Sequence, residues 1–146
     1  MQEITRNRIL FATGSLWALP VTLFGLIVGV LLIPFGARLS VSDSALVFSG
    51  FRVFGSGALT LGQVILNARP DLEDLVLTYD CAANGGVECV RLGTHEKAHV
   101  YQYMALGVFF PLLYFLHGGI SHKNRFEQAA DRYALTGQGW WPYPRK

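Results

Sequence analysis

An uncharged segment near the start of the sequence limits most strongly what this chain can form. No charged side chain occurs between residues 9 and 37, and this run exceeds the ~20 apolar residues that cross the hydrocarbon of a bilayer. We therefore predict a transmembrane anchor at residues 9–37, in which Pro20 is tolerable because neighbouring groups can satisfy the freed carbonyl. A cleaved signal peptide is the alternative, but its apolar core is usually about 7–15 residues long and no convincing cleavage site follows here.

Positive charges flank this anchor unequally. Arg6 and Arg8 precede it, whereas only Arg38 follows closely, and cytoplasmic flanks carry the excess of positive charge. We expect residues 1–8 to be cytoplasmic and the main domain to lie on the other side of the membrane, beside the lipid.

Two further features bear on partners. Gly25 and Gly29 form a G-x-x-x-G pattern that could bring two copies of the anchor together as a homo-oligomer, although glycine is common in membrane helices and the pattern is weak. The formal net charge is +2 and the basic residues form no cluster, so we expect no nucleic-acid partner.

Residues 38–92 predict a small antiparallel β region. Short alternating runs within residues 38–54 favour a hairpin, and residues 75–79 and 87–92 favour two more strands. Residues 59–66 are compatible with either a strand or a short buried helix. If this segment is an edge strand, an extended peptide could pair with it; a core strand is the other possibility.

Cys81 and Cys89 bracket a Gly- and Asn-containing segment that favours a hairpin turn. Such a turn would bring the two sulfurs together, so we predict a disulfide, which requires an oxidising compartment. Two free, buried thiols are the alternative, because two cysteines alone make a weak pattern.

The residues with the clearest chemistry are His95, Glu96 and His99, which form an H-E-x-x-H pattern. Thr94 is a candidate N-cap, so we expect a helix to begin at Thr94 with Glu96 in its first turn. Helical residues four apart differ by only about 40° around the axis, so both imidazoles would face one metal ion. Zn²⁺ prefers such ligands, and Glu96 would be the base that activates a zinc-bound water for attack on a peptide carbonyl.

A third ligand is expected downstream, where residues 124–134 predict an amphipathic helix. Glu127 and Asp131 lie one turn apart on one face of that helix. We expect Glu127 to bind the metal and Asp131 to accept the second N–H of a ligand histidine, which fixes its tautomer.

This arrangement resembles a known class of enzymes. H-E-x-x-H followed by E-x-x-x-D is similar to gluzincin metallopeptidases, and the E-x-x-A-D stretch is similar to the membrane-bound Ste24/HtpX-like group. The chain also resembles small bacterial membrane proteins that combine T-L-G, H-E-x-x-H-V-x-Q-Y and N-x-F-E patterns. The matching residues fall between 59 and 134: Thr60-Leu61-Gly62, His95 through Tyr103, and Asn124-Arg125-Phe126-Glu127. The resemblance implies zinc at His95, His99 and Glu127, Glu96 as base, and a bacterial cytoplasmic (inner) membrane.

The apolar residues 100–116 present a topological problem. They approach the length of a membrane span, but a full crossing would separate Glu127 from His95 and His99 by the bilayer. Pro111 interrupts the run and is expected to kink or end the helix. We therefore predict a re-entrant or interfacial segment, with the metal close to the membrane surface.

Several other residues are weaker candidates. Tyr103, Tyr133 and His122 are possible hydrogen-bond donors to an oxyanion, although an ordinary packing or loop position is the favoured interpretation of each. His117 is expected at a helix end rather than at the metal. The aromatic and basic tail at residues 140–146 is expected either at a membrane interface or packed on the domain.

Together these features predict an α+β membrane protein that acts as a membrane-anchored zinc metallopeptidase-like hydrolase on a peptide or protein substrate. The alternative is a non-catalytic structural or accessory subunit of a membrane protein complex, in which zinc is a structural staple. A degenerate site without metal is a third possibility. The expected divisions are a cytoplasmic start (1–8), the anchor (9–37), the β region (38–92), a zincin-like helical region (93–139) and the tail (140–146).

Overall fold

The computed structural model describes residues 2–42, 44–53, 55 and 57–143. It begins with a long helix, α1 (Gln2–Leu32), which is followed by a 3₁₀ turn, η1 (Ile33–Phe35). Within this region, Asn7–Phe35 is long and apolar enough to cross a membrane. Pro20 lies inside α1 without ending it, and at 1.5 Å per residue the helix is about 46 Å long. Residues 9–32 of the predicted anchor thus lie in one α-helix, and residues 33–35 continue it as a 3₁₀ turn.

The sheet that follows is mixed, and the prediction of a purely antiparallel β region is wrong. Its strands are β1 (Arg38–Ser42), β2 (Ala45–Ser49), β3 (Ala58–Leu61) and β4 (Val64–Asn67), arranged in the order β1-β2-β4-β3. β1–β2 and β3–β4 are antiparallel pairs, whereas β2 and β4 are parallel. The connection after β2 carries the chain across the sheet before the second hairpin starts, so β3 becomes an edge strand.

The segment that was ambiguous between strand and helix is a tight hairpin. β3 and β4 are joined through Gly62, which has φ +65°. A side chain at Gly62 would also collide with Thr22 of α1. Only glycine combines this conformation with this close approach.

A second, two-stranded sheet joins β5 (Leu75–Leu77) to β6 (Cys89–Arg91), with a short helix, α2 (Tyr79–Asn84), between them. The expected disulfide is absent, because Cys81 and Cys89 are free thiols. The Thr78 side chain accepts a hydrogen bond from Cys81 N at 3.3 Å and caps α2, so a helix replaces the expected hairpin turn. Neither thiol is buried, and the cysteines give no support for an oxidising compartment.

The remaining helices are α3 (Leu92–Leu106), a 3₁₀ turn η2 (Gly107–Phe109), α4 (Phe110–Leu116) and α5 (Arg125–Thr136). Leu92–Leu116 is the second described segment that is long and apolar enough to cross a membrane. The helix starts after Arg91, not at Thr94, so Thr94 is not its N-cap and Glu96 is not in its first turn. The amides of Leu92 and Gly93 donate to loop carbonyls at 2.9 and 2.8 Å, so no side-chain cap is needed.

The helix breaks earlier than expected. Gly107, with φ +56°, ends α3, whereas Pro111 lies in the first turn of α4, where proline is tolerated. Trp17 of α1 lies where a side chain at Gly107 would be. The predicted interruption is therefore present, but Gly107 causes it.

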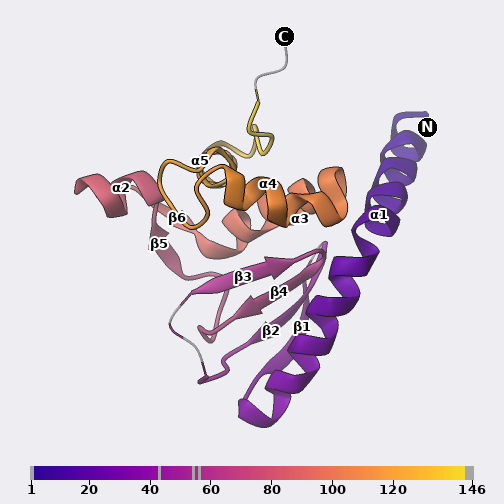
Figure 1. Ribbon diagram of the computed structural model, residues 1–146, viewed down its shortest axis with the longest axis horizontal. Helices are drawn as coiled ribbons and strands as arrows, with labels where there is room; N and C mark the ends of the chain where they lie inside the picture. Colours follow the sequence, from indigo (N-terminus) through magenta and orange to yellow (C-terminus); the bar gives the residue numbers. More distant parts are fainter. Residues whose placement is uncertain (1, 43, 54, 56, 144–146) are drawn as a thin grey trace.

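Helices α3, α4 and α5 lie on one side of the four-stranded sheet, and α1 runs beside both layers (Figure 1). Small residues on α1 allow this close packing: a side chain at Gly14 would meet Met104, one at Gly25 would meet Leu61, and one at Gly29 would meet Phe48. The Gly25/Gly29 face, which was a weak candidate for contact with a second copy, is thus in contact with the chain's own sheet.

Candidate metal centre

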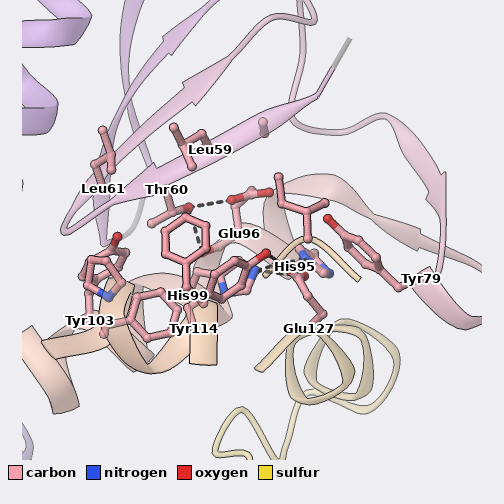
Figure 2. Close-up of a pocket in the computed structure, with 15 residues that line it drawn as sticks. Leu59, Thr60, Leu61, Tyr79, His95, Glu96, His99, Tyr103, Tyr114 and Glu127 are labelled. Atoms are coloured by element: carbon pink, nitrogen blue, oxygen red, sulfur yellow. Dashed lines mark hydrogen bonds and ion pairs between the residues drawn. The ribbon is translucent and has the colours of Figure 1, made fainter. Parts of the chain in front are cut away.

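His95 and His99 project from one face of α3 toward Glu127 of α5. The two Nε2 atoms are 3.2 Å apart, and Glu127 Oε2 lies 3.0 Å from His95 Nε2 and 3.3 Å from His99 Nε2. All three side chains are buried, and they point toward one another in Figure 2. This group could hold a metal ion.

The spacing of these atoms fits a tetrahedral metal. Zinc bonds to imidazole nitrogen and carboxylate oxygen are about 2.0–2.2 Å long, so two ligand atoms of a tetrahedron stand about 3.3–3.5 Å apart. The three observed separations run from 3.0 to 3.3 Å, slightly closer than that value. The ligand atoms therefore need only a small outward adjustment to accept an ion.

Asp131 holds His95 from behind. Its Oδ1 lies 2.8 Å from His95 Nδ1, and its Oδ2 accepts a hydrogen bond from Tyr79 N at 2.7 Å. Because a carboxylate only accepts, Nδ1 of His95 carries a proton, and Nε2 is the atom that faces the candidate metal position. Asp131 thus lies where the sequence predicted, one helical turn after Glu127.

Asn124 caps the helix that carries Glu127. Its side chain accepts a hydrogen bond from Phe126 N at 2.9 Å and donates to Tyr114 O at 3.0 Å and Gly119 O at 2.7 Å. The same residue therefore starts α5 and ties it to the end of α4. These hydrogen bonds hold the start of α5 against the end of α4, so that Glu127 can lie beside His95.

The surroundings of Glu127 favour its charged form, which is the form that binds a cation. Burial alone would favour its neutral form, but the positive charge of His99 and hydrogen bonds from His95 and His99 hold the pKa of Glu127 well below its ordinary value. Tyr114 of α4 donates a hydrogen bond to Glu127 Oε1, which leaves Oε2 facing the imidazoles. Tyr114 was missed by the sequence analysis because its neighbours in residues 110–116 are all apolar.

Glu96 lies beside this group and is fixed by the edge strand. Its Oε2 accepts a hydrogen bond from Thr60 Oγ1 at 2.6 Å, drawn as a dashed line in Figure 2. Both side chains are buried. Thr60 belongs to the T-L-G pattern, but nothing local in the sequence indicates its contact with a residue 36 positions away.

A pocket of about 290 Å³ opens next to these residues. Thr60, Glu96 and the three candidate ligands contribute polar groups, and the rest of the wall is largely apolar and aromatic. The apolar lining comes from β3, α4 and the following loop: Leu59, Leu61, Phe110, Pro111, Phe115 and Ile120. A small polar group in an apolar pocket is typical of ligand and substrate sites.

Of the three weaker candidates for an oxyanion donor, Tyr103 lines the pocket, whereas Tyr133 and His122 do not. Tyr103 lines the pocket and packs against Phe110 at 4.4 Å between ring centroids. Tyr133 packs on Tyr101 and borders a separate groove beside the tail. The carbonyl of His122 accepts a hydrogen bond from Gln128, in the loop before α5.

Residues 140–143, the described part of the tail, pack on the domain. His117 is the C-cap of α4, as expected of a helix-end residue, and its Nε2 lies 2.7 Å from the Tyr143 hydroxyl. Trp140 packs against Tyr101. Residues 144–146 of the predicted tail lie outside the described residues.

No match to this chain is found among models of known protein families, among curated proteins or among solved structures. The resemblance to gluzincins therefore rests on the site residues alone.

Proposed function

We propose that this protein is a membrane-anchored, zinc-dependent hydrolase of metallopeptidase type. The observation that carries the proposal is that Glu96 and the group of His95, His99 and Glu127 share one pocket. Two imidazoles and a carboxylate suit Zn²⁺. When bound, zinc supplies a Lewis acid that lowers the pKa of water and polarises a carbonyl.

The protein's own groups have separate roles in this proposal. Glu96 accepts a proton from the attacking water, and Thr60 fixes the Glu96 carboxylate through the 2.6 Å hydrogen bond. Tyr114 holds Glu127 by its Oε1, so that Glu127 offers the metal a single oxygen.

A catalytic centre is favoured over a structural staple by the number of ligands. Structural zinc sites are closed, with four protein ligands, whereas catalytic sites use three and keep one position open. The group described here has three members and borders the pocket. The alternative of an accessory subunit with a zinc staple is therefore the less favoured one.

A peptide substrate is favoured by the edge strand. β3 lies at the end of the sheet order and lines the pocket with residues 58–61. Edge strands bind extended peptides through backbone pairing. A peptide paired with β3 would pass close to Glu96, and one of its apolar side chains would enter the pocket.

We also propose that the site lies at the membrane surface, with the exposed apolar side chains of α4 against the lipid beside α1. Exposed apolar side chains cover the outer side of η2 and α4 and the loop after it: Val108, Phe109, Leu112, Phe115, Leu116 and Ile120. This surface continues onto α1, because Trp17 and Phe109 are in ring contact at 6.2 Å. Two candidate ligands precede α4 in the sequence and one follows it, yet all three lie together. This supports an apolar segment that does not cross the membrane.

Hydrolysis is tested by replacing the proposed base. We expect purified wild type with zinc to cleave members of a quenched fluorescent peptide pool, and Glu96→Gln to lose at least about 100-fold in rate, the lower range for general-base catalysis. Glu88→Gln is the matched control, because Glu88 is an exposed carboxylate outside the pocket. Equal cleavage by Glu96→Gln and wild type, at equal zinc content, would rule out this role for Glu96.

A further inference from the structure

Gln102 is a buried amide whose orientation is fixed by its surroundings. Its side chain is fully buried, and its Nε2 donates to two backbone carbonyls, Phe126 O at 3.2 Å and Trp140 O at 2.9 Å. Carbonyls only accept hydrogen bonds, so the amide nitrogen must face them and Oε1 must face the opposite way. Oε1 lies 2.8 Å from His99 Nδ1.

This orientation determines the tautomer of His99. Because Gln102 Oε1 can only accept, Nδ1 of His99 must carry a proton, and its Nε2 is the atom left to bind a metal. Asp131 does the same for His95 with a carboxylate. The Nδ1 atoms of the two ligand histidines are therefore oriented by different groups, a carboxylate at His95 and an amide oxygen at His99.

The carbonyl that orients Gln102 belongs to the C-terminal tail. Arg132 of α5 holds the tail on both sides of Trp140, with its guanidinium donating to Gly139 O at 2.9 Å and to Trp141 O at 3.1 Å. A side chain at Gly139 would collide with Arg132, so the tail turn fits closely against α5. The tail thus reaches His99 through one intervening side chain.

We propose that Gln102 is a positioning residue through which the docked C-terminal segment, residues 138–143 including the described part of the tail, controls metal binding at His99. Docking of the tail keeps the Gln102 amide oriented, and this orientation keeps His99 in the ligand tautomer. Release of the tail removes one of the two carbonyls that hold Nε2 and lowers the affinity for zinc. The effect on affinity rests on the proposed metal site, whereas the effect on the His99 hydrogen bond does not.

The test combines zinc affinity with a spectroscopic readout in the metal-free protein. Zinc affinity is measured by chelator competition for wild type, Gln102→Met, a chain ending at Gly137, and the combination of both changes. Gln128→Met is the matched control, because Gln128 is an exposed glutamine on α5 whose side chain donates a hydrogen bond to the loop carbonyl of His122. The Nδ1–H resonance of His99 is followed by nitrogen-15 NMR of the same proteins in detergent micelles.

We expect Gln102→Met to lower zinc affinity by about 10- to 100-fold, as for other groups that orient a metal ligand. Shortening the chain should lower zinc affinity by about 5-fold or more in the wild-type background. It should lower the affinity by only about 2-fold or less in Gln102→Met, because both changes interrupt the same series of hydrogen bonds from Trp140 to His99. An equal loss in both backgrounds would overturn the proposal.

The NMR readout separates this inference from the proposed function. In metal-free wild type we expect a slowly exchanging His99 Nδ1–H resonance that is lost or broadened in Gln102→Met and in the shortened chain, and kept in Gln128→Met. A resonance unchanged by shortening would overturn the tail linkage even if zinc binds. If wild type binds no zinc, the proposed function fails, but the His99 resonance still tests whether the tail orients His99 through Gln102. If Gln102→Met does not fold, the resonance of the shortened chain decides that question.

Discussion

The hydroxyl of Thr60 donates a hydrogen bond to Glu96 Oε2 at 2.6 Å. This contact joins the edge strand β3 to the helix that carries both histidines. It fixes the proposed base relative to the strand on which a peptide would pair. The position of Glu96 therefore depends on the sheet as well as on its own helix.

Replacing Thr60 tests this dependence. Thr60→Val keeps the shape of the side chain but leaves a buried carboxylate without its donor, which costs about 1.5–3 kcal/mol. We expect lower thermal stability in detergent and slower peptide cleavage, and we expect Thr60→Ser to restore both. Thr60→Val with wild-type stability and rate would show that the hydrogen bond does not matter.

Asp131 is expected to act through His95. Asp131→Ala removes the acceptor for His95 Nδ1 at 2.8 Å, so the imidazole can rotate or change tautomer. We expect a 10- to 100-fold loss of zinc affinity, about the usual effect of removing such a partner. Asp80→Ala, which removes an exposed carboxylate from α2, should leave the affinity unchanged; an equal loss in both variants would argue against a specific role for Asp131.

The glycine face of α1 is expected to stabilise the fold of the single chain. A Cβ at Gly29 would lie 2.3 Å from the ring of Phe48, and overpacking of this kind costs about 1–3 kcal/mol. We expect Gly29→Ala to lower the unfolding temperature in detergent. Gly57→Ala is the control, because nothing lies within 4 Å of a Cβ there. An altered oligomeric state at unchanged stability would instead favour pairing of two anchors.

The proposed membrane contact of α4 can be tested with a fluorescent label. In a chain whose two cysteines are replaced by serine, single cysteines at Phe115 and at Val87 carry an environment-sensitive dye. Phe115 is 72% exposed on the proposed lipid face, whereas Val87 is 91% exposed on the loop before β6. In vesicles with brominated lipids we expect strong quenching only at position 115. Equal quenching at both positions would contradict an interfacial α4.

The candidate ligands were predictable because their geometry is local. Helical spacing alone places His95 near His99, and Glu127 near Asp131. Their meeting across α3 and α5 followed from the chemistry of a shared metal rather than from any sequence pattern. The prediction that residues 100–116 do not fully cross the membrane followed from the same requirement, and it stays a prediction.

Other features depended on tertiary contacts that the sequence does not display. Thr60 and Tyr114 contact residues 36 and 13 positions away. Gln102 lies only three residues from His99, but it is oriented by the distant carbonyls of Phe126 and Trp140. The parallel pairing of β2 with β4 arises from a crossover that strand patterns do not encode. The disulfide prediction was wrong because the capping of α2 by Thr78 favoured a helix over the expected turn.

The most direct test of the metal centre is the zinc content of the purified protein. We expect about one zinc per chain in wild type and in Glu88→Ala, and a loss of most of it in Glu127→Ala, because Glu127 supplies the only carboxylate of the described ligand group. Wild type without bound zinc, or Glu127→Ala with a full zinc complement, would contradict a centre built on His95, His99 and Glu127.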